Sequence, residues 1–517
     1  MSFGPVHRYL GSPPEAAGLA TLFERLADLA AAQPDAPWLI APDRLGAAET
    51  LAFAEAERRS AGIAAWAAEQ GLDRGTRVAL APRNDIDSAV ALLGLMRAGL
   101  PTLVINPQEP PARLAEILGD MPCAAVIAPS AAAAGAATNL TLPAPDELPP
   151  RRADLDEPRP GDVSLLFGTS GSTAASKIVR QSHLALSANA EALRRHHGLA
   201  PGRRMLGCLP VHHVNGCHFT LMATLWAGAT AILLERFEAA PFHDAVRTWR
   251  PALASVVPTI LEALVADGAR LPHDFGYFVS AAAPLSARTA SRVLDRLGAR
   301  VLQGFGLTET SNFSTTMPLG LDERSYRRLT CDADIPSIGG ALYGNEVRTL
   351  RADGGPCDDG EIGEICMRGF NVMLDYADNP EATAAAFAYD WFHSGDMGCV
   401  RRDPDGRAYL FITGRAKNIA KVMGLPVSLE EMERALLRLP GIADAACCAI
   451  PDAVMGEAVV ALVAAPAGLD RKAVEAHLSD YFSPLVLPRR YLPVAAVPRT
   501  PTGKVIRGDV AAIARAS

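Results

Sequence analysis

The chain has 517 residues, of which 49% are hydrophobic and 21% are charged, and its formal net charge is −8. This composition excludes a wholly disordered chain, a coiled coil and a collagen, and the acidic balance argues against a nucleic-acid partner. None of the nine cysteines forms a C-x-x-C pair, so zinc-ribbon and thioredoxin-type sites have no support. The first ten residues have no apolar signal core, and the most apolar stretch, 88–105, is interrupted by Arg97, Gly99 and Pro101. We therefore expect a reduced, cytoplasmic protein without a membrane span.

The first 150 residues alternate between helix-like and strand-like segments. Leucines recur at helical spacing within 22–30, and a second helix-like stretch lies at 91–96. Short apolar runs typical of strands lie at 77–81, 102–105 and 124–128. This alternation predicts βαβ units and a parallel sheet. The segment 131–150, an alanine-rich run followed by four prolines, is interpreted as a surface linker, although one poorly packed helix is the alternative.

The strongest local signal is a hydroxyl-rich loop that follows an apolar, strand-like run at 165–167. Its candidate phosphate ligands are Thr169, Ser170, Gly171, Ser172, Thr173 and Lys177. Hydroxyl and backbone N–H groups can surround phosphate oxygens, and a lysine adds a positive charge. The loop is not a Walker A motif, because G-x-x-x-x-G-K-[ST] is absent. Taken alone, it is either a phosphate site or a Ser/Thr-rich surface turn, and a helix is expected next, at 184–197, with Gly198 as its C-cap.

The last hundred residues have the pattern of a separate, small α+β unit. Ser428 and Glu431 form a capping box in front of an apolar helix face. Two strand-like runs and a second helix follow at 445–450, 459–465 and 471–481. From Lys417 onward the chain carries 12 Lys and Arg against 10 Asp and Glu, a net charge of +2 that leaves −10 on the remainder. The small unit is therefore better suited to approach an anionic ligand, although chance surface charge explains the difference nearly as well.

Four further segments place chemically active side chains together. They lie at 304–310, 391–396, 414–418 and 501–504. Together with the hydroxyl-rich loop, in this order and at these separations, they resemble the adenylate-forming superfamily of acyl-CoA synthetases, peptide-synthetase adenylation domains and luciferases. The resemblance extends from about Leu22 to Arg507. It implies an α/β fold with a large N-terminal body of mixed sheets flanked by helices, 1–416, and a small mobile α+β C-terminal lid domain, 417–517.

Members of this superfamily convert a carboxylate and ATP into acyl-AMP and pyrophosphate, and a nucleophile then takes the acyl group. The resemblance implies that residues 169–177 hold the β- and γ-phosphates and that Ala283 and Pro284 lie beside adenine. Phe305 would stack on the base, as an aromatic face can. Asp396 would accept from both ribose hydroxyls, and Arg415 would bind ribose or phosphate as a fixed donor fork.

The same resemblance implies the catalytic groups. Thr308 would contact the α-phosphate, and Glu309 would hold Mg²⁺, a hard cation that prefers oxygen ligands. Lys504 would bridge the substrate carboxylate and the α-phosphate while negative charge moves toward pyrophosphate. Without the other motifs, Lys504 would read as an exposed tail lysine.

A hinge is also implied. Lys417 matches the hinge about which the lid rotates between two poses. In one pose Lys504 reaches the site, and in the other the stretch with Lys421 and Gly424 faces it for acyl transfer.

The acid pocket is expected beside the segment 210–216. The candidate lining residues are His212, His213, Asn215, Gly216, Val279, Ala281 and Gly304. His213 occupies the usual histidine position of the family and would gate the pocket. Either His212 or His213 would accept a proton, and a packed, hydrogen-bonded histidine is the alternative. The other lining residues suggest a mostly apolar cavity, with no cation for a second carboxylate. An apolar carboxylic acid is therefore favoured over an amino acid as the activated substrate.

The phosphate loop departs from the family pattern T-S-G-[ST]-T-G-x-P-K-G. Ala174, Ala175 and Ser176 stand before Lys177, so two glycines and the proline are missing and the loop is expected to be stiffer. This loop sequence, together with the segment His-His-Val-Asn-Gly, most resembles the sequences of coronafacate-ligase-like enzymes. Those enzymes join an activated acid to an amino acid. We therefore expect an amino-acid amine as the acceptor.

Two alternatives remain open. The first is transfer to the CoA thiol, with cations for its 3′-phosphate among Arg434, Arg438, Arg489 and Arg490. The second is a non-catalytic acyl- or nucleotide-binding relative, against which the intact candidate catalytic residues argue.

Overall fold

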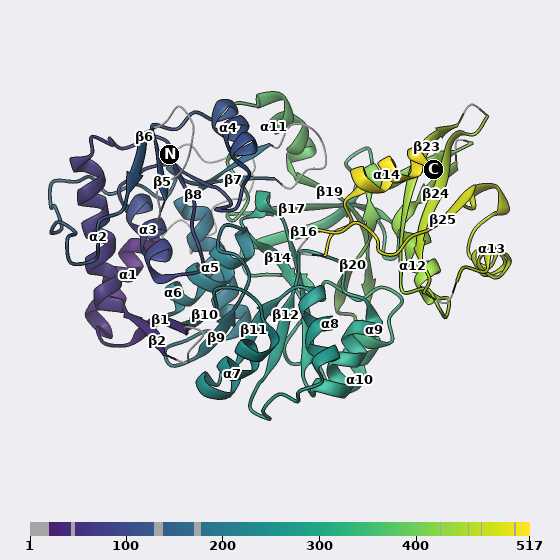
Figure 1. Ribbon diagram of the computed structural model, residues 1–517, viewed down its shortest axis with the longest axis horizontal. Helices are drawn as coiled ribbons and strands as arrows, with labels where there is room; N and C mark the ends of the chain where they lie inside the picture. The colour runs from purple at the N-terminus through teal and green to yellow at the C-terminus, as the bar shows by residue number, and fades with distance from the viewer. Residues whose placement is uncertain are drawn as a thin grey trace.

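The computed structural model describes residues 20–42, 47–128, 138–169, 177–423, 425–452, 454–466, 468–500 and 503–517. The α/β fold class predicted from the sequence is confirmed: two large sheets and a smaller one form the N-terminal part, and a fourth sheet forms the C-terminal part. Figure 1 shows this C-terminal part at one end of the molecule, with β19 (Phe392–Arg402) and β20 (Ala408–Arg415) between it and the remainder.

The first large sheet has seven strands in the order β18-β8-β7-β4-β3-β5-β6. They are β3 (Val78–Leu80), β4 (Thr102–Val104), β5 (Ala125–Ala128), β6 (Thr138–Thr141), β7 (Val163–Gly168), β8 (Ile178–Ser182) and β18 (Asp375–Tyr376). Strands β3, β4, β5 and β7 pair in parallel, which confirms the predicted βαβ arrangement. Their buried apolar runs are typical of parallel strands covered on both faces.

The second large sheet has nine strands in the order β15-β14-β13-β12-β11-β9-β10-β1-β2. They are β1 (Pro37–Pro42), β2 (Ala48–Ala52), β9 (Arg204–Gly207), β10 (Thr230–Leu233), β11 (Leu253–Val256), β12 (Tyr277–Ser280), β13 (Arg300–Gly306), β14 (Phe313–Thr316) and β15 (Gly340–Ala341). Its central strands are parallel, so their carboxyl ends lie at one edge, where ligands bind in open α/β sheets.

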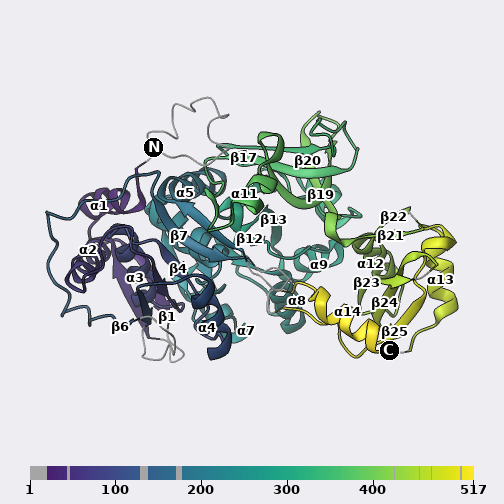
Figure 2. The same ribbon diagram turned by 90° about the horizontal axis from the view of Figure 1, so that it is seen from above.

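Helices cover both large sheets (Figure 2). They are α1 (Leu22–Ala32), α2 (Phe53–Glu69), α3 (Ile86–Arg97), α4 (Pro111–Asp120), α5 (His183–His197), α6 (Ala223–Ala227), α7 (Ala239–Trp249), α8 (Pro258–Asp267), α9 (Ala287–Arg292) and α10 (Glu323–Tyr326). One core cluster joins side chains of both sheets with α1, α2, α3, α5 and α6. Helix α5 ends at the predicted C-cap Gly198 (φ 61°), and the structure shows that it begins at a Ser182 cap.

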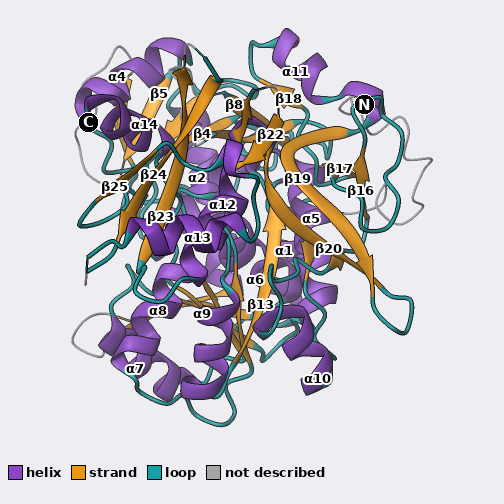
Figure 3. Cartoon of the chain, turned by 90° about the vertical axis from the view of Figure 1, so that its right-hand side faces the viewer, coloured by secondary structure: helices purple, strands orange, loops and turns teal. Residues whose placement is uncertain are grey.

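The third sheet, β16-β17-β19-β20, leads to the C-terminal part (Figure 3). Its elements are β16 (Asn345–Leu350), β17 (Gly363–Gly369), β19 (Phe392–Arg402) and β20 (Ala408–Arg415), with α11 (Pro380–Ala386) alongside. The fourth sheet contains β21 (Ile419–Val422), β22 (Leu425–Ser428), β23 (Asp444–Asp452), β24 (Gly456–Ala464) and β25 (Arg490–Pro493), with α12 (Leu429–Arg438), α13 (Arg471–Ser479) and α14 (Arg507–Ala516). The chain passes between the two sheets at a short 3₁₀ turn, Ala416–Asn418.

Three local expectations need correction or completion. Residues 138–141 of the predicted linker form β6, because their backbone pairs with the edge of the parallel sheet through β5; residues 131–137 lie outside the described part. Most of the candidate segment 391–396, including Asp396, lies within β19. At α12 the Ser428 hydroxyl accepts from the Glu431 N–H at 3.3 Å, which is one half of the predicted capping box. Within the described residues, no helix has the length and apolar character to cross a bilayer.

Candidate active site

The structure brings the predicted catalytic lysine to the predicted nucleotide residues. Lys504 lies close enough to Asp396, Glu309 and Arg415 for their charges to act on it. Burial and the Arg415 guanidinium lower the pKa of Lys504, whereas the two carboxylates act in the opposite direction. An ammonium group in this position lies within electrostatic range of both the expected ribose ligand and the expected metal ligand.

The backbone around Gly503 determines this placement. Gly503 has φ 86°, and a Cβ there would lie 2.9 Å from Thr259 Cγ2 and 3.9 Å from Ala283 Cβ. The Lys504 N–H donates to Thr500 Oγ1 at 3.1 Å, and Arg499 donates to the Gly503 carbonyl at 2.7 Å. A glycine is required here because the backbone touches α8 and adopts a positive φ.

Asp396 and Arg415 face each other across β19 and β20. They are directly paired in the antiparallel register, and Arg415 Nε lies 2.7 Å from Asp396 Oδ1. Asp396 is only 4% exposed. Burial raises the pKa of Asp396, and the Arg415 and Lys504 charges oppose that rise. The carboxylate is therefore preorganised by a cation and shielded from bulk water.

Glu309 is held by a residue that sequence reasoning missed. The Tyr376 hydroxyl donates to Glu309 Oε1 at 2.7 Å, and the Lys177 ammonium lies 4.6 Å from the centroid of the same tyrosine ring. The Met373 N–H donates to the Glu309 carbonyl at 2.7 Å. Tyr376 thus joins the predicted phosphate lysine to the predicted metal ligand. The carboxylate is the oxygen donor that Mg²⁺ prefers, so this residue fits the ion.

Thr308 is anchored from behind by two buried side chains. Gln181 Nε2 donates to the Thr308 carbonyl at 2.8 Å, and His218 Nε2 lies 2.9 Å from Gln181 Oε1. Burial lowers the pKa of His218 to about 3, so the ring is neutral and donates through this nitrogen. No local motif marks Gln181 or His218, because their role depends on contacts far apart in the sequence.

The predicted acid segment is fixed by Asn84. This side chain accepts from the Val211 N–H at 2.9 Å and donates to the Leu209 carbonyl at 3.0 Å. His212 and His213 follow, with ring centroids 4.5 Å apart. Burial lowers the pKa of His212 to about 3, and burial together with the Lys504 charge lowers the pKa of His213. Both rings are therefore neutral near pH 7.

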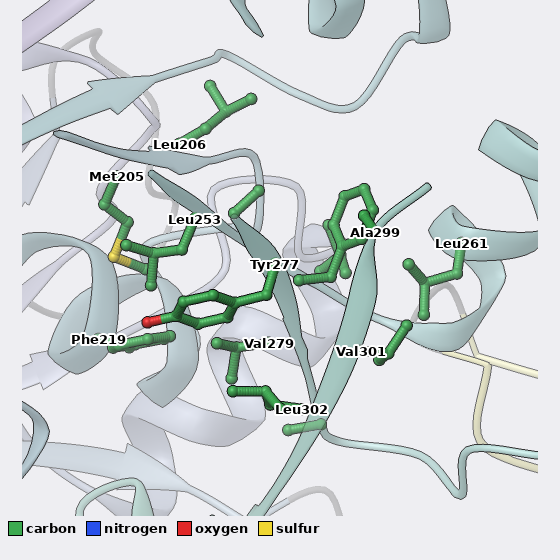
Figure 4. Close-up of a cluster of buried hydrophobic side chains, with 14 of the residues drawn as sticks. Met205, Leu206, Phe219, Leu253, Leu261, Tyr277, Val279, Ala299, Val301 and Leu302 are labelled. Carbon is green, nitrogen blue, oxygen red and sulfur yellow. The ribbon is translucent and has the colours of Figure 1, made fainter. Parts of the chain in front are cut away.

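The remaining acid-pocket candidates lie between the 215–222 helical segment and the nine-stranded sheet. Ser255 Oγ donates to Asn215 Oδ1 at 2.6 Å, and a Cβ on Gly216 would lie 2.3 Å from the Pro210 carbonyl oxygen. Val279 and Ala281 are buried on and beside β12. Figure 4 shows Phe219 of the same helical segment beside Tyr277 and Val279.

Gly304 faces the ring of Phe313. A Cβ on Gly304 would lie 3.0 Å from that ring, and the Phe313 and Phe219 centroids are 5.4 Å apart in an edge-to-face pair. Phe313 is 2% exposed. Two packed aromatic rings therefore fill the space beyond Gly304.

The expected adenine side is more open. Ala282 and Pro284 are exposed and Ala283 is half-buried, while Phe305 is buried at the margin of the cluster around the third sheet. Ala282 has φ 69°, a conformation that favours glycine. Strain at a non-glycine residue is often found at functional sites.

Some predicted residues are not placed in the site. Ser170, Gly171, Ser172, Thr173 and Gly424 lie outside the described residues. The Thr169 N–H donates to the Lys177 carbonyl at 2.9 Å, which joins the two ends of the phosphate loop. Lys417 lies in the 3₁₀ turn and Lys421 on β21, both exposed.

The four arginines considered for CoA do not converge. Arg434 donates to the Thr413 carbonyl, Arg438 pairs with Asp334, Arg490 donates to the Ala514 carbonyl, and Arg489 is exposed beyond α13. They therefore form no common phosphate site in this pose.

Comparisons with known proteins agree with this geometry. Residues 26–377 match the AMP-binding enzyme family, and residues 431–504 match its C-terminal domain family. The chain is 33% identical to sulfoacetate–CoA ligase of Cupriavidus necator over 512 residues, covering 94% of this chain and 96% of that protein. It is 30% identical to feruloyl-CoA synthase of an Amycolatopsis species over 476 residues, covering 89% and 93%.

Solved structures show the same architecture. ATP-bound MatB from Rhodopseudomonas palustris superimposes with a TM-score of 0.80 at 26% identity, covering 95% of this chain and 98% of that one. The o-succinylbenzoate CoA synthetase of Bacillus subtilis with ATP and magnesium gives a TM-score of 0.81 at 21% identity, covering 94% and 99%. This second likeness concerns the fold alone.

Proposed function

The chain belongs to the AMP-binding enzyme family of adenylate-forming ligases, and on this basis we propose that it joins a carboxylic acid to the thiol of coenzyme A. The observation that carries the proposal is similarity over nearly the whole chain to a CoA ligase, at 33% identity. A site with Lys504 facing Asp396 and Glu309 supports it.

In the first half-reaction, a carboxylate oxygen attacks the α-phosphorus of ATP and pyrophosphate leaves. Lys504 would neutralise charge on the carboxylate and the α-phosphate, while Thr308 contacts the α-phosphate. Asp396 would bind the ribose hydroxyls, and Glu309, steadied by Tyr376, would hold Mg²⁺. The ion would supply charge neutralisation for the phosphates. The residues 169–177 would hold the β- and γ-phosphates.

In the second half-reaction, the CoA thiol loses its proton, its sulfur attacks the acyl carbonyl carbon, and AMP leaves with the former mixed-anhydride oxygen. We propose that the lid 417–517 rotates about Lys417 between the two steps, so that Lys504 withdraws and the stretch of Lys421 and Gly424 faces the site. Withdrawal of the lysine loop would open space for the incoming thiol. His213, whose lowered pKa leaves the ring neutral near pH 7, is the predicted candidate to accept the thiol proton.

The amino-acid acceptor predicted from the sequence of the phosphate loop has no support among the relatives named above. The physical reason is that residues 170–176 are expected to contact the β- and γ-phosphates of ATP. The amino-acid sequence of this loop therefore indicates how ATP is bound and does not identify the acceptor. An amide-forming activity therefore serves here as the outcome to be tested against thioester formation.

The acid is proposed to be largely apolar around its carboxylate. Val279, Ala281 and Gly304 support this, since each is buried and uncharged. The named relatives act on acids as different as sulfoacetate and ferulate, so the acid must be identified on this chain itself.

The direct test incubates the protein with ATP, Mg²⁺ and a panel of short and long carboxylic acids. Parallel reactions contain either CoA or a mixture of amino acids, and products are identified by mass spectrometry. Thioesters are expected in the CoA reactions, with AMP and pyrophosphate released in equal amounts. Amides without thioesters would overturn the proposed acceptor, and no acid-dependent AMP would overturn the ligase function.

A further inference from the structure

The strand that carries Asp396 contains a bulge. Glu364 of β17 pairs with Met397 of β19, and Cys366 pairs with His393, so residues 394–396 lie opposite the single residue Ile365. Gly395 in this bulge has φ 72°. Bulges are concentrated next to active sites, where they redirect a side chain. Asp396 is one of the bulged residues.

One carboxylate closes the bulge. Glu364 Oε1 accepts from the Gly395 N–H at 2.8 Å, and Glu364 Oε2 lies 2.8 Å from His393 Nδ1. The Ser394 hydroxyl donates to the Ile365 carbonyl at 2.6 Å and accepts from the Asp396 N–H at 3.0 Å. The residues before Asp396 are thus tied to β17, mainly through Glu364.

The imidazole of His393 links this carboxylate to a second acceptor. Its Nε2 lies 3.0 Å from the Ala388 carbonyl oxygen. Because a carboxylate and a carbonyl both accept, each ring nitrogen must donate, which requires the imidazolium form. The hydrogen bond to Glu364 raises the pKa of His393 and thereby favours this form.

Few other titratable groups lie near the ring. The Cys366 thiol of β17 is 3.4 Å from Nδ1, and the Tyr389 ring of the preceding turn is 6.2 Å away. Arg368 of β17 donates to the Asp390 carbonyl on that turn. The Glu364 carboxylate is the charged partner in direct contact.

We propose that the Glu364–His393 ion pair positions Asp396 for the ribose of ATP by holding the bulge of β19 in register. His393 and Glu364 are positioning residues, since neither is required to touch the nucleotide. The inference rests on the proposed role of Asp396 as the ribose ligand. It gives a role to a half-buried ion pair, which has no other part in the proposed mechanism.

The test measures ribose recognition directly, by the affinity of the full chain for ATP and for 2′,3′-dideoxy-ATP with Mg²⁺, in calorimetric titrations without acid or acceptor. Wild-type protein is expected to prefer ATP by at least about tenfold, and His393→Ala to lose most of that preference. Binding of the dideoxy nucleotide is expected to change little. His393→Gln should recover part of the preference, because its amide N–H can still donate to Glu364.

A matched control removes a comparable histidine elsewhere. His477 is half-buried and lies 2.9 Å from the Ala435 carbonyl oxygen within the lid, so His477→Ala is expected to keep the full preference. A pH series adds a second readout. Preference for ATP should decrease as pH rises through the raised pKa of His393 in wild-type protein and stay flat in His393→Gln.

Three outcomes would overturn the inference. They are a wild-type protein without preference for ATP, a His393→Ala variant that retains the full preference, and an equal loss of affinity for both nucleotides. If circular dichroism shows that His393→Ala does not fold, the ratio of the affinities for ATP and 2′,3′-dideoxy-ATP is measured in Glu364→Gln and His393→Gln instead. The titrations contain no carboxylic acid, so they measure nucleotide binding independently of the proposed ligase reaction. A failure of the ligase proposal would therefore be distinguishable from a failure of this inference.

Discussion

Among single residues, Lys504 combines a lowered pKa with two carboxylates that attract its charge. We expect Lys504→Gln to slow acid-dependent ATP–pyrophosphate exchange about 10²–10³-fold, the usual loss when a donor to developing charge is removed. Thioester formation from supplied acyl-AMP and CoA should persist, because that step is proposed to occur with Lys504 withdrawn. An equal loss in both assays would contradict the assignment.

The same residue gives a pH dependence. Since the ammonium form is the active one and its pKa is lowered from the ordinary value of 10.5, exchange should decrease with rising pH earlier than for an unperturbed lysine. Lys504→Arg should abolish this decrease, because a guanidinium does not deprotonate in that range. A wild-type profile that stays flat up to the ordinary lysine pKa would argue against the lowered value.

At the scale of elements, the aromatic pair beyond Gly304 predicts the length of the acid. Phe313 and Phe219 fill the space between the 215–222 segment and the sheet, so short acids should be preferred. We expect Phe313→Ala to raise kcat/KM for longer acids relative to short ones by about tenfold, the worth of added room in an apolar pocket. Its unfolding free energy should decrease by about 3–5 kcal/mol.

A second buried phenylalanine, which packs on Phe278 and therefore on the face of β12 opposite to the one that carries Val279, separates these two effects. Phe242 of α7 is fully buried, so Phe242→Ala should destabilise the protein similarly and leave the acid preference unchanged. An unaltered preference in Phe313→Ala would show that the acid lies elsewhere.

Elements that depend on local pattern were predictable from sequence. The apolar runs of β3, β4 and β5 and the C-cap of α5 at Gly198 needed only neighbouring residues. Tyr376 was missed because its bond to Glu309 spans 67 residues. The bulge of β19 was missed because it is defined by its partner strand. The motif residues of the site were predicted from the family resemblance. Gln181, His218 and Asn84 support them through contacts between residues far apart in the sequence, which no local motif can predict.

At the scale of the whole molecule, the C-terminal part brings Lys504 close to Asp396 and Glu309, which is the arrangement proposed above for the adenylation step. Arg438 pairs with Asp334 across the two parts, and the connection between them is the 3₁₀ turn Ala416–Asn418. Residues in such a turn have φ near that of proline, about −65°. Lys417→Pro should therefore favour this pose and oppose rotation.

We expect Lys417→Pro to keep ATP–pyrophosphate exchange within a few-fold of wild type and to slow thioester formation by roughly 10²-fold or more, as for hinge variants that block a required conformational step. Lys417→Ala, which leaves φ free, is the control and should retain both activities. Equal losses in the two half-reactions would count against an alternating lid.

The central claim, an acyl-adenylate passed to CoA, is tested most directly by a chase. The protein is first incubated with ATP, Mg²⁺, pyrophosphatase and an accepted acid, so that enzyme-bound acyl-AMP accumulates. CoA or an amino acid is then added, and the fate of the labelled acyl group is followed by rapid quench. The account predicts rapid conversion to acyl-CoA with one AMP released per thioester. Acyl-AMP that persists with CoA but forms an amide with the amino acid would contradict it.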